Sequence, residues 1–191
     1  MLMKTCLTTV ALFAAGSLHS LLSAPVSAAQ VSMACSETAL PAPINELLKA
    51  KFSQWRPKQV SDVDAHDRQL WLKAHEKECP GIAVGHFESA DRLSYAALLV
   101  PKSEPRGGYK IVVISKGPAG DAYTWRLLDH ADGQTYSGLV ISKAEPGLYS
   151  DFELTESIQT KLDGVYVEWI EKGGQLYYWS GDRYRKLQLS D

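Results

Sequence analysis

Residues 93–115 read LSYAALLVPKSEPRGGYKIVVIS, two apolar runs on either side of a turn sequence. The runs Leu93–Val100 and Tyr109–Ser115 are rich in aromatic, β-branched and other apolar residues, a composition that predicts strands. The segment between them ends in Pro105-Arg106-Gly107-Gly108, whose proline and glycines favour a turn. Because the connection is short, the two strands are expected to pair as an antiparallel hairpin.

Further strand patterns lie on both sides of this hairpin. Six more strands are expected, over Ile82–Phe87, Ala122–Leu128, Gly138–Lys143, Gly164–Glu171, Leu176–Trp179 and Tyr184–Leu189. Turn sequences such as Asp132-Gly133 and Gly173-Gly174 separate them. Short connections of this kind predict a mainly antiparallel sheet.

Alternation along two of these strands predicts faces buried in the core. The residues expected to be buried on this basis are Val165, Val167 and Trp169 and, on a different strand, Tyr123, Trp125 and Leu127. Residues 153–161 have a short helical pattern, which Thr155 and Ile158 disfavour because β-branched residues have a lower helix propensity.

Two helices are expected before the strands. The first covers INELLKAKFSQW, residues 44–55, where Ile44, Leu48 and Phe52 recur at helical spacing, and it ends before Pro57. The second is expected over Ala65–Lys77, with acidic residues in its first turn and lysines in its last. Both helices have an apolar stripe that requires a partner surface.

The first 29 residues, MLMKTCLTTVALFAAGSLHSLLSAPVSAA, have the layout of a secretory signal peptide. Lys4 precedes an apolar core, and small residues up to Ala28 form a cleavage site. The interpretation is a removed signal at residues 1–29 and one exported domain at residues 30–191, in the periplasm or outside the cell. An uncleaved anchor is the alternative. No membrane span is expected after cleavage.

Two cysteines, Cys35 and Cys79, remain once the signal and its Cys6 are removed. In an oxidising compartment two cysteines most simply pair, so a Cys35–Cys79 disulfide is expected. Lipidation of Cys35 is an alternative, but the preceding Ser32-Met33-Ala34 lacks the leucine usual in a lipoprotein signal. A disulfide would also remove Cys79 as a nucleophile.

Motifs for metal binding and catalysis are incomplete in this chain. The residues His66, His75, Cys79 and His86 lack the paired spacing of a structural zinc site. An EF-hand loop starting at Asp62 would place Asp67 and Lys73 where glycine and glutamate are needed. There is no G-x-S-x-G and no phosphate-binding loop. No catalytic residue, metal or cofactor is therefore expected.

Charge and aromatic content indicate which partners suit the chain. The formal charge is -2, with lysine and arginine scattered, so nucleic acid is not expected as a partner. The C-terminal hairpin concentrates aromatic residues, and adjacent residues on a strand face opposite sides. It therefore either lies in a sheet covered on both faces or presents a binding surface. The candidate binding surface comprises Tyr177, Tyr178, Trp179, Arg183 and Tyr184.

A candidate polar cluster follows the first expected strand. It consists of His86, Glu88 and Asp91, of which the first two are two residues apart and share a strand face. If these residues converged with His130 in one cleft, they could support acid–base chemistry.

The segment Gly85-His86-Phe87 followed by Tyr95-Ala96-Ala97-Leu98-Leu99 resembles a G-x-F…Y-A-L-L hairpin of exported bacterial proteins with FG-GAP or VCBS-like modules. The ending YYW…GDRYRKLQLSD is similar to the closing hairpin of periplasmic proteins with that pattern. The resemblance implies an exported β-rich fold and no particular reaction. The turn of residues 88–92 has too few acidic residues for the calcium loop of that family.

These observations predict an α+β domain in which two N-terminal helices pack on a mostly antiparallel, twisted sheet of about seven or eight strands. The predicted function is non-catalytic binding of a protein or envelope component, as an inhibitor or immunity protein does. A small cell-envelope hydrolase and a structural envelope protein are the alternatives. The sequence leaves the oligomeric state open.

Overall fold

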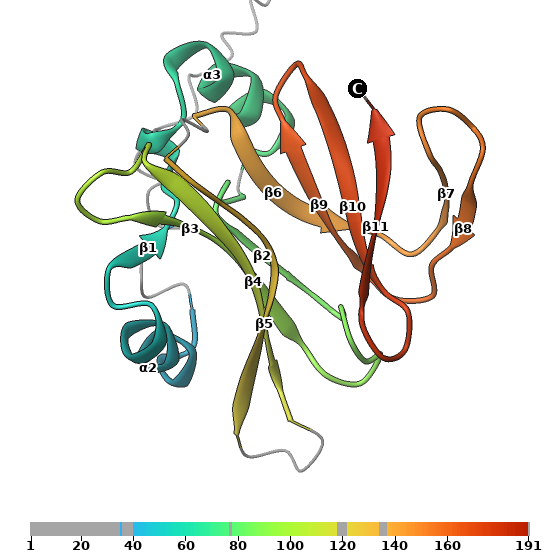
Figure 1. Ribbon diagram of the computed structural model, residues 1–191, viewed down its shortest axis with the longest axis horizontal. Coiled ribbons are helices and arrows are strands. Elements are labelled where there is room, and N and C mark those ends of the chain that lie inside the picture. The colour runs from blue at the N-terminus through green and yellow to red at the C-terminus, as the bar shows by residue number, and fades with distance from the viewer. Residues whose placement is uncertain (1–34, 36–39, 77, 118–121, 134–136, 191) are drawn as a thin grey trace, which may run out of the picture.

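Two antiparallel sheets face each other in the computed structural model, which describes residues 35, 40–76, 78–117, 122–133 and 137–190 (Figure 1). The predicted signal peptide lies outside the described residues. Two α-helices, a short 3-10 helix and eleven strands are present in the described part. None of its helices has the length and apolar character that a membrane span requires.

The first sheet has five strands: β1 (Trp55–Pro57), β2 (Ile82–Gly85), β3 (Ser94–Pro101), β4 (Gly108–Lys116) and β5 (Tyr123–Asp132). Its order is β1-β3-β4-β5, and β2 also pairs with β3. β1 and β2 lie end to end along the same edge of β3. Between them, Leu98 accepts a hydrogen bond from Lys58 N–H and donates one to Gly81.

The second sheet has the order β11-β10-β9-β6, and a two-stranded sheet lies beside it. Its members are β6 (Leu139–Ala144), β9 (Gly164–Trp169), β10 (Gly173–Trp179) and β11 (Tyr184–Ser190). The small sheet consists of β7 (Leu148–Ser150) and β8 (Ser157–Gln159). Figure 1 shows this small hairpin projecting beyond β11.

The main core fills the space between the two large sheets. Alternate residues of each strand point into it because the side-chain period of a strand is two. The buried residues include Ala96, Leu98, Ile111, Val113, Leu139, Ile141, Val165 and Val167. The predicted burial of Val165 and Val167 is confirmed, and Trp169 packs partly buried against the same core.

Each helix covers the outer face of a different sheet. α2 (Ala42–Lys51) packs Ile44 and Leu48 against Leu99 and Ile114 of the first sheet. α3 (Ala65–Ala74) packs Trp71 against the outer face of the second sheet. β3 and β4 are thus covered on both faces, which is why consecutive residues along them are buried.

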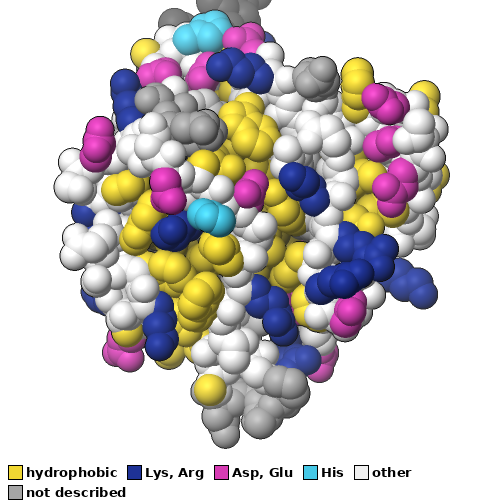
Figure 2. Space-filling view, viewed as in Figure 1, with side chains coloured by type: hydrophobic (Ala, Val, Ile, Leu, Met, Phe, Trp, Pro, Cys, Tyr) yellow, Lys and Arg dark blue, Asp and Glu magenta, His cyan; other side chains and the backbone are white. Residues whose placement is uncertain are grey.

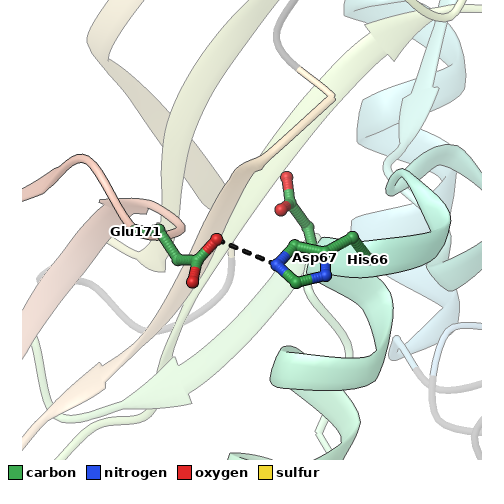
Figure 3. Close-up of side chains that lie close together, drawn as sticks. All are labelled: His66, Asp67 and Glu171. Atoms are coloured by element: carbon green, nitrogen blue, oxygen red, sulfur yellow. Dashed lines mark hydrogen bonds and ion pairs between the residues drawn. The ribbon is translucent and has the colours of Figure 1, made fainter.

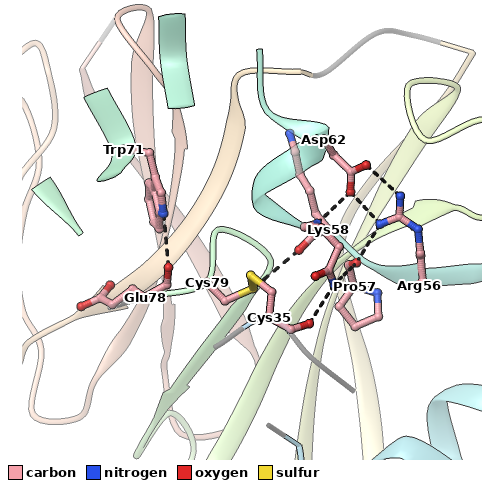
Figure 4. The surroundings of a disulfide bond; sticks show 9 residues. Cys35, Arg56, Pro57, Lys58, Asp62, Trp71, Glu78 and Cys79 are labelled. Atoms are coloured by element: carbon pink, nitrogen blue, oxygen red, sulfur yellow. Dashed lines mark hydrogen bonds and ion pairs between the residues drawn. A yellow bond between two sulfur atoms is a disulfide. The ribbon is translucent and has the colours of Figure 1, made fainter. Parts of the chain in front are cut away.

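The two sheets join along one side, which we call the closed side (Figure 4). Here the predicted Cys35–Cys79 disulfide is confirmed, with 5.0 Å between the two Cα atoms. The nearby Lys58 side chain is fully buried, and its Nζ donates to the carbonyls of Ser137 and Leu139 at 2.6 and 2.7 Å. Ile141 N–H also donates to the Pro80 carbonyl across the junction, at 2.9 Å.

Several sequence-based expectations about the fold are wrong. The described residues build eleven strands in three sheets rather than one sheet of seven or eight strands, and α2 and α3 lie on separate sheets. Residues 153–161 form no helix, since β8 occupies Ser157–Gln159. Trp125 and Leu127 are 40% and 44% exposed because β5 is an edge strand, where alternation does not guarantee cover.

Candidate functional site

A pocket of about 610 Å³ opens between β5 and the β10–β11 hairpin, on the side opposite the closed side. We call it the basic groove. It is lined by Trp125–Asp129 of β5, Tyr177 of β10, and Asp182–Lys186 at the start of β11. Because neighbouring residues point to opposite faces of a strand, five consecutive lining residues mean that the groove meets the edge of β5.

Both strands that border the groove end their sheets. β5 pairs only with β4, and β11 pairs only with β10. Near its C-terminal end, β11 accepts a hydrogen bond at Gln188 O from Phe152 N–H, at 2.9 Å. That contact covers the far part of β11 and leaves the part near Tyr184–Lys186 facing the groove. Two strand edges therefore border one opening.

Positive charge dominates the lining of the groove. Its cationic side chains are Arg126, Arg183, Arg185 and Lys186, and its anionic ones are Asp129 and Asp182. The whole chain, in contrast, carries a formal charge of -2. Figure 2 shows lysine and arginine side chains gathered near the β10–β11 turn. The groove therefore favours an anionic ligand.

Arg126 is held in place by two neighbours. Its Nε lies 3.1 Å from the Glu88 carboxylate, and its guanidinium carbon lies 5.1 Å from the centre of the Trp179 ring. Trp179 in turn makes an edge contact with Tyr184, with 5.1 Å between ring centres. Burial, together with the neighbouring Glu88 carboxylate, raises the pKa of Tyr184. Its hydroxyl therefore stays protonated at physiological pH.

Asp129 forms part of the groove wall and accepts three hydrogen bonds from within the protein. Tyr177 and Tyr109 both donate to its Oδ2, at 2.9 and 3.2 Å, and His130 N–H donates to its Oδ1 at 2.8 Å. Burial first, and the Asp129 charge second, raise the pKa of Tyr177 and keep its hydroxyl protonated. This carboxylate therefore orders the wall, and its hydrogen-bonding capacity is largely used within the protein.

A second pocket of about 480 Å³ lies against the same hairpin. It is lined by Gln159–Leu162 and Tyr178–Gly181. The five residues of the predicted binding surface thus divide between two pockets. Tyr177, Arg183 and Tyr184 line the basic groove, while Tyr178 and Trp179 line the second pocket. Strand alternation puts Tyr177 and Tyr178 on opposite faces, and Trp179, at the end of β10, also contacts Arg126 and Tyr184 of the basic groove.

The three residues of the predicted polar cluster, His86, Glu88 and Asp91, each contact a different partner. The backbone N–H of His86 donates to Asp163 at 2.7 Å, and Glu88 pairs with Arg126 beside the groove. Asp91 lies in an exposed turn, bonded to Ser89. β2 ends at Gly85, so His86 and Glu88 lie beyond the strand whose face they were expected to share.

Sequence reasoning missed much of the groove. Arg126 and Asp129 come from β5, about fifty positions before the aromatic hairpin in the chain, and no motif links them to it. Arg185 and Lys186 could have been predicted, because they directly follow Arg183 and Tyr184 of the predicted binding surface. Charged residues are common on edge strands, however, so their presence in the sequence does not indicate a binding site.

The histidines considered for zinc lie apart. Cys79 is in the disulfide, and the His75 ring stacks on Trp71 with 4.1 Å between ring centres. His66 instead lies beside Asp67 and Glu171, the second of which sequence reasoning did not consider (Figure 3). His66 Nε2 is 3.0 Å from a carboxylate oxygen of Glu171.

The likeness to FG-GAP or VCBS-like hairpins in residues 85–100 stays a prediction. The site therefore has to be interpreted from its own geometry and charge. No family model matches the chain, and no match to it is found among curated proteins or among solved structures.

Proposed function

We propose that this chain is a non-catalytic binding domain that takes an extended, acidic segment of a partner protein into the basic groove. The observation that carries this proposal is the meeting of two strand edges with four cationic side chains in one opening. The disulfide fits an oxidising compartment, and we place the protein in the periplasm or outside the cell.

An extended segment suits the groove because strand edges carry unpaired backbone groups. A peptide that adds as a strand gains main-chain hydrogen bonds from the edge, whatever its side chains. Trp125 and Leu127 of β5 are exposed beside that edge and offer apolar contact area to alternate side chains of the segment. The edge thus supports affinity, and the side chains around it support selectivity.

An acidic segment suits the charges. Arg126 is fixed by Glu88 and Trp179, so little side-chain entropy is lost when its guanidinium meets a carboxylate. Arg183, in the turn before β11, and Arg185 and Lys186 of β11 lie on the other side of the groove. Partly exposed charges of this kind steer association and are screened by salt, so binding should weaken as ionic strength rises.

The hydrolase alternative has less support. It required His86, Glu88, Asp91 and His130 to converge, whereas His86, Glu88 and Asp91 contact three different partners. Asp129, the carboxylate that does line the groove, already accepts three hydrogen bonds. A binding role requires only the surface that is present.

The proposal is tested with a fluorescein-labelled decapeptide of alternating glutamate and threonine. Fluorescence anisotropy of the oxidised protein should show saturable binding at low salt, and the double variant Arg183→Glu/Arg185→Glu should lower the affinity at least tenfold. The control is Lys51→Glu/Lys73→Glu, which makes the same change in net charge on the helices. A matched lysine–threonine peptide should not bind.

Strand addition has its own readout. Bound peptide should slow hydrogen exchange at backbone amides of β5 or β11, because new main-chain hydrogen bonds protect them. Two results would overturn the proposal. One is equal loss of affinity in the control and groove variants. The other is tighter binding of a ten-nucleotide single strand than of the acidic peptide, which would favour a nucleic-acid ligand.

A further inference from the structure

We infer that His66, Asp67 and Glu171 form a binding site for a divalent transition-metal ion, with zinc as the best-suited probe. This metal triad lies on the outer side of the second sheet and does not depend on the proposed function. Its donor atoms all lie within 4.8 Å of one another, and it is the only such group among the described residues. Figure 3 shows the three side chains converging from two elements.

The donor set suits zinc and related ions. One imidazole nitrogen and two carboxylate oxygens are common zinc ligands, with bond lengths of roughly 2.0–2.2 Å. In a tetrahedral complex two such ligand atoms lie roughly 3.4 Å apart, so separations of up to 4.8 Å need to shorten by about 1.4 Å at most. His66 and Glu171 can make this adjustment because their side chains are 71% and 59% exposed.

Two features of the backbone fit a ligand-holding role. Asp67 Oδ2 lies 2.5 Å from where a Cβ of Gly138 would be, so only glycine at 138 leaves room for the carboxylate as it is placed. Glu171 adopts φ 62° in the β9–β10 turn, a conformation that glycine or asparagine would adopt with less strain. The chain keeps a glutamate there, where its side chain reaches His66.

The local charges favour a cation on balance. The N-terminus of α3 opposes a cation, because the helix dipole is positive at that end. Against this, the two carboxylates of the metal triad attract a divalent ion directly, and metal coordination replaces the His66–Glu171 contact. Three protein ligands leave the remaining coordination positions to water or to a group of a partner.

A bound ion would link α3 to the β9–β10 turn. His66 and Asp67 belong to the first turn of α3, and Glu171 belongs to the turn that joins two strands of the second sheet. An ion that binds only the folded arrangement stabilises it by mass action. The melting temperature should therefore rise with zinc concentration in the protein that binds it.

The test is a zinc titration of tag-free protein freed of metal by a chelator. Isothermal titration calorimetry should show one zinc per chain, with the affinity at least tenfold weaker in His66→Ala and in Glu171→Gln. The matched control is His75→Ala. His75 pairs with Glu78 at 3.1 Å near the other end of α3, and no third ligand group joins that pair in the described part of the chain.

The expected pattern is loss of binding and of zinc-dependent thermal stabilisation in the two triad variants, with both retained in His75→Ala. Because His66 and Glu171 are exposed, both variants should fold, which unfolding curves without zinc will check. Absence of zinc binding by the unsubstituted protein would overturn the inference. Equal weakening in His66→Ala and His75→Ala would overturn it as well.

Discussion

The sandwich is closed along one side and open along the other, and the two sides differ in chemistry. On the closed side the disulfide ties Cys35 to Cys79, just before β2, and the buried Lys58 and the Pro80–Ile141 hydrogen bond join the two sheets. On the open side β5 and β11 border the basic groove, where Trp125 is 40% exposed. The disulfide and the buried lysine thus lie on one side, whereas the other side has two unpaired strand edges and surface charges, with the Tyr177–Asp129 hydrogen bond crossing between the sheets.

This difference separates stability from binding. A sheet edge lined with arginine and lysine contributes little to the core, because exposed charges are worth little in water. The closed side can hold the sheets together while the open side keeps its backbone edges unpaired. Substitutions on the closed side should therefore change mainly the free energy of unfolding. Substitutions on the open side should change mainly the affinity for the ligand.

The largest expected effect is loss of the disulfide on the closed side. Cys35 and Cys79 are separated by 44 positions, and closing a loop of that size stabilises a fold by roughly 4 kcal/mol on the chain-entropy model. The Cys35→Ser/Cys79→Ser variant should lose about that free energy of unfolding in urea. Intact mass after alkylation without reductant checks that the reference protein is oxidised. A loss below about 1 kcal/mol would contradict this account of the closed side.

A second substitution probes the junction beside the disulfide. A Cβ added at Gly81 would lie 2.3 Å from the Lys58 carbonyl oxygen, so Gly81→Ala requires the backbone to shift. We expect a loss of about 3 kcal/mol, the upper part of the range for overpacking. The control is Gly147→Ala, where the nearest atom lies at 3.6 Å, an ordinary contact. Similar unfolding curves for the two variants would show that the junction is pliable.

These closed-side features were only partly predictable. The disulfide followed from two cysteines in a chain predicted to be exported, and the hairpin of residues 93–115 was predicted close to the observed β3 and β4. The burial of Lys58 could not be predicted, because a lysine in an extended segment is normally exposed. Its burial depends on the approach of β6, about eighty positions later in the chain.

The division of the strands into two sheets could not be predicted either. Alternation tells which residues of a strand share a face, but not which strand lies opposite. Val165 and Trp125 have similar local patterns, yet Val165 lies in a central strand and Trp125 in an edge strand. For the same reason the sequence did not predict that Arg126 lines the groove or that Glu171 lies beside His66. In each case the neighbouring residues come from segments that are distant in the chain.

The third prediction concerns pH and Lys58. Burial lowers the pKa of its amine to about 8 from 10.5, although Asp62, Asp64 and Asp67 act in the opposite direction. Between these two pKa values the unfolded chain binds more protons than the folded one, so this group makes stability rise with pH. A neutral amine still has two N–H donors, enough for both carbonyls that it contacts.

The measurement compares urea unfolding of the natural protein and Lys58→Met at pH 7.5 and pH 10. The natural protein should gain on the order of 2 kcal/mol relative to the variant over this interval. Tyrosine ionisation affects both proteins equally and cancels in the difference. If the difference in free energy of unfolding between the two proteins stayed constant with pH, the Lys58 amine would be hydrated in solution, and the prediction would be wrong.

The smallest expected effect on stability comes from the open side. Arg183→Glu/Arg185→Glu changes side chains at the mouth of the groove, where exposed charges should shift the free energy of unfolding by less than about 0.5 kcal/mol each. The same variant should lose at least tenfold in affinity for the acidic peptide. Urea unfolding and peptide anisotropy on one preparation measure both. If the variant lost binding together with several kcal/mol of stability, the separation of the two sides would fail, because the groove would then be part of what holds the sheets together.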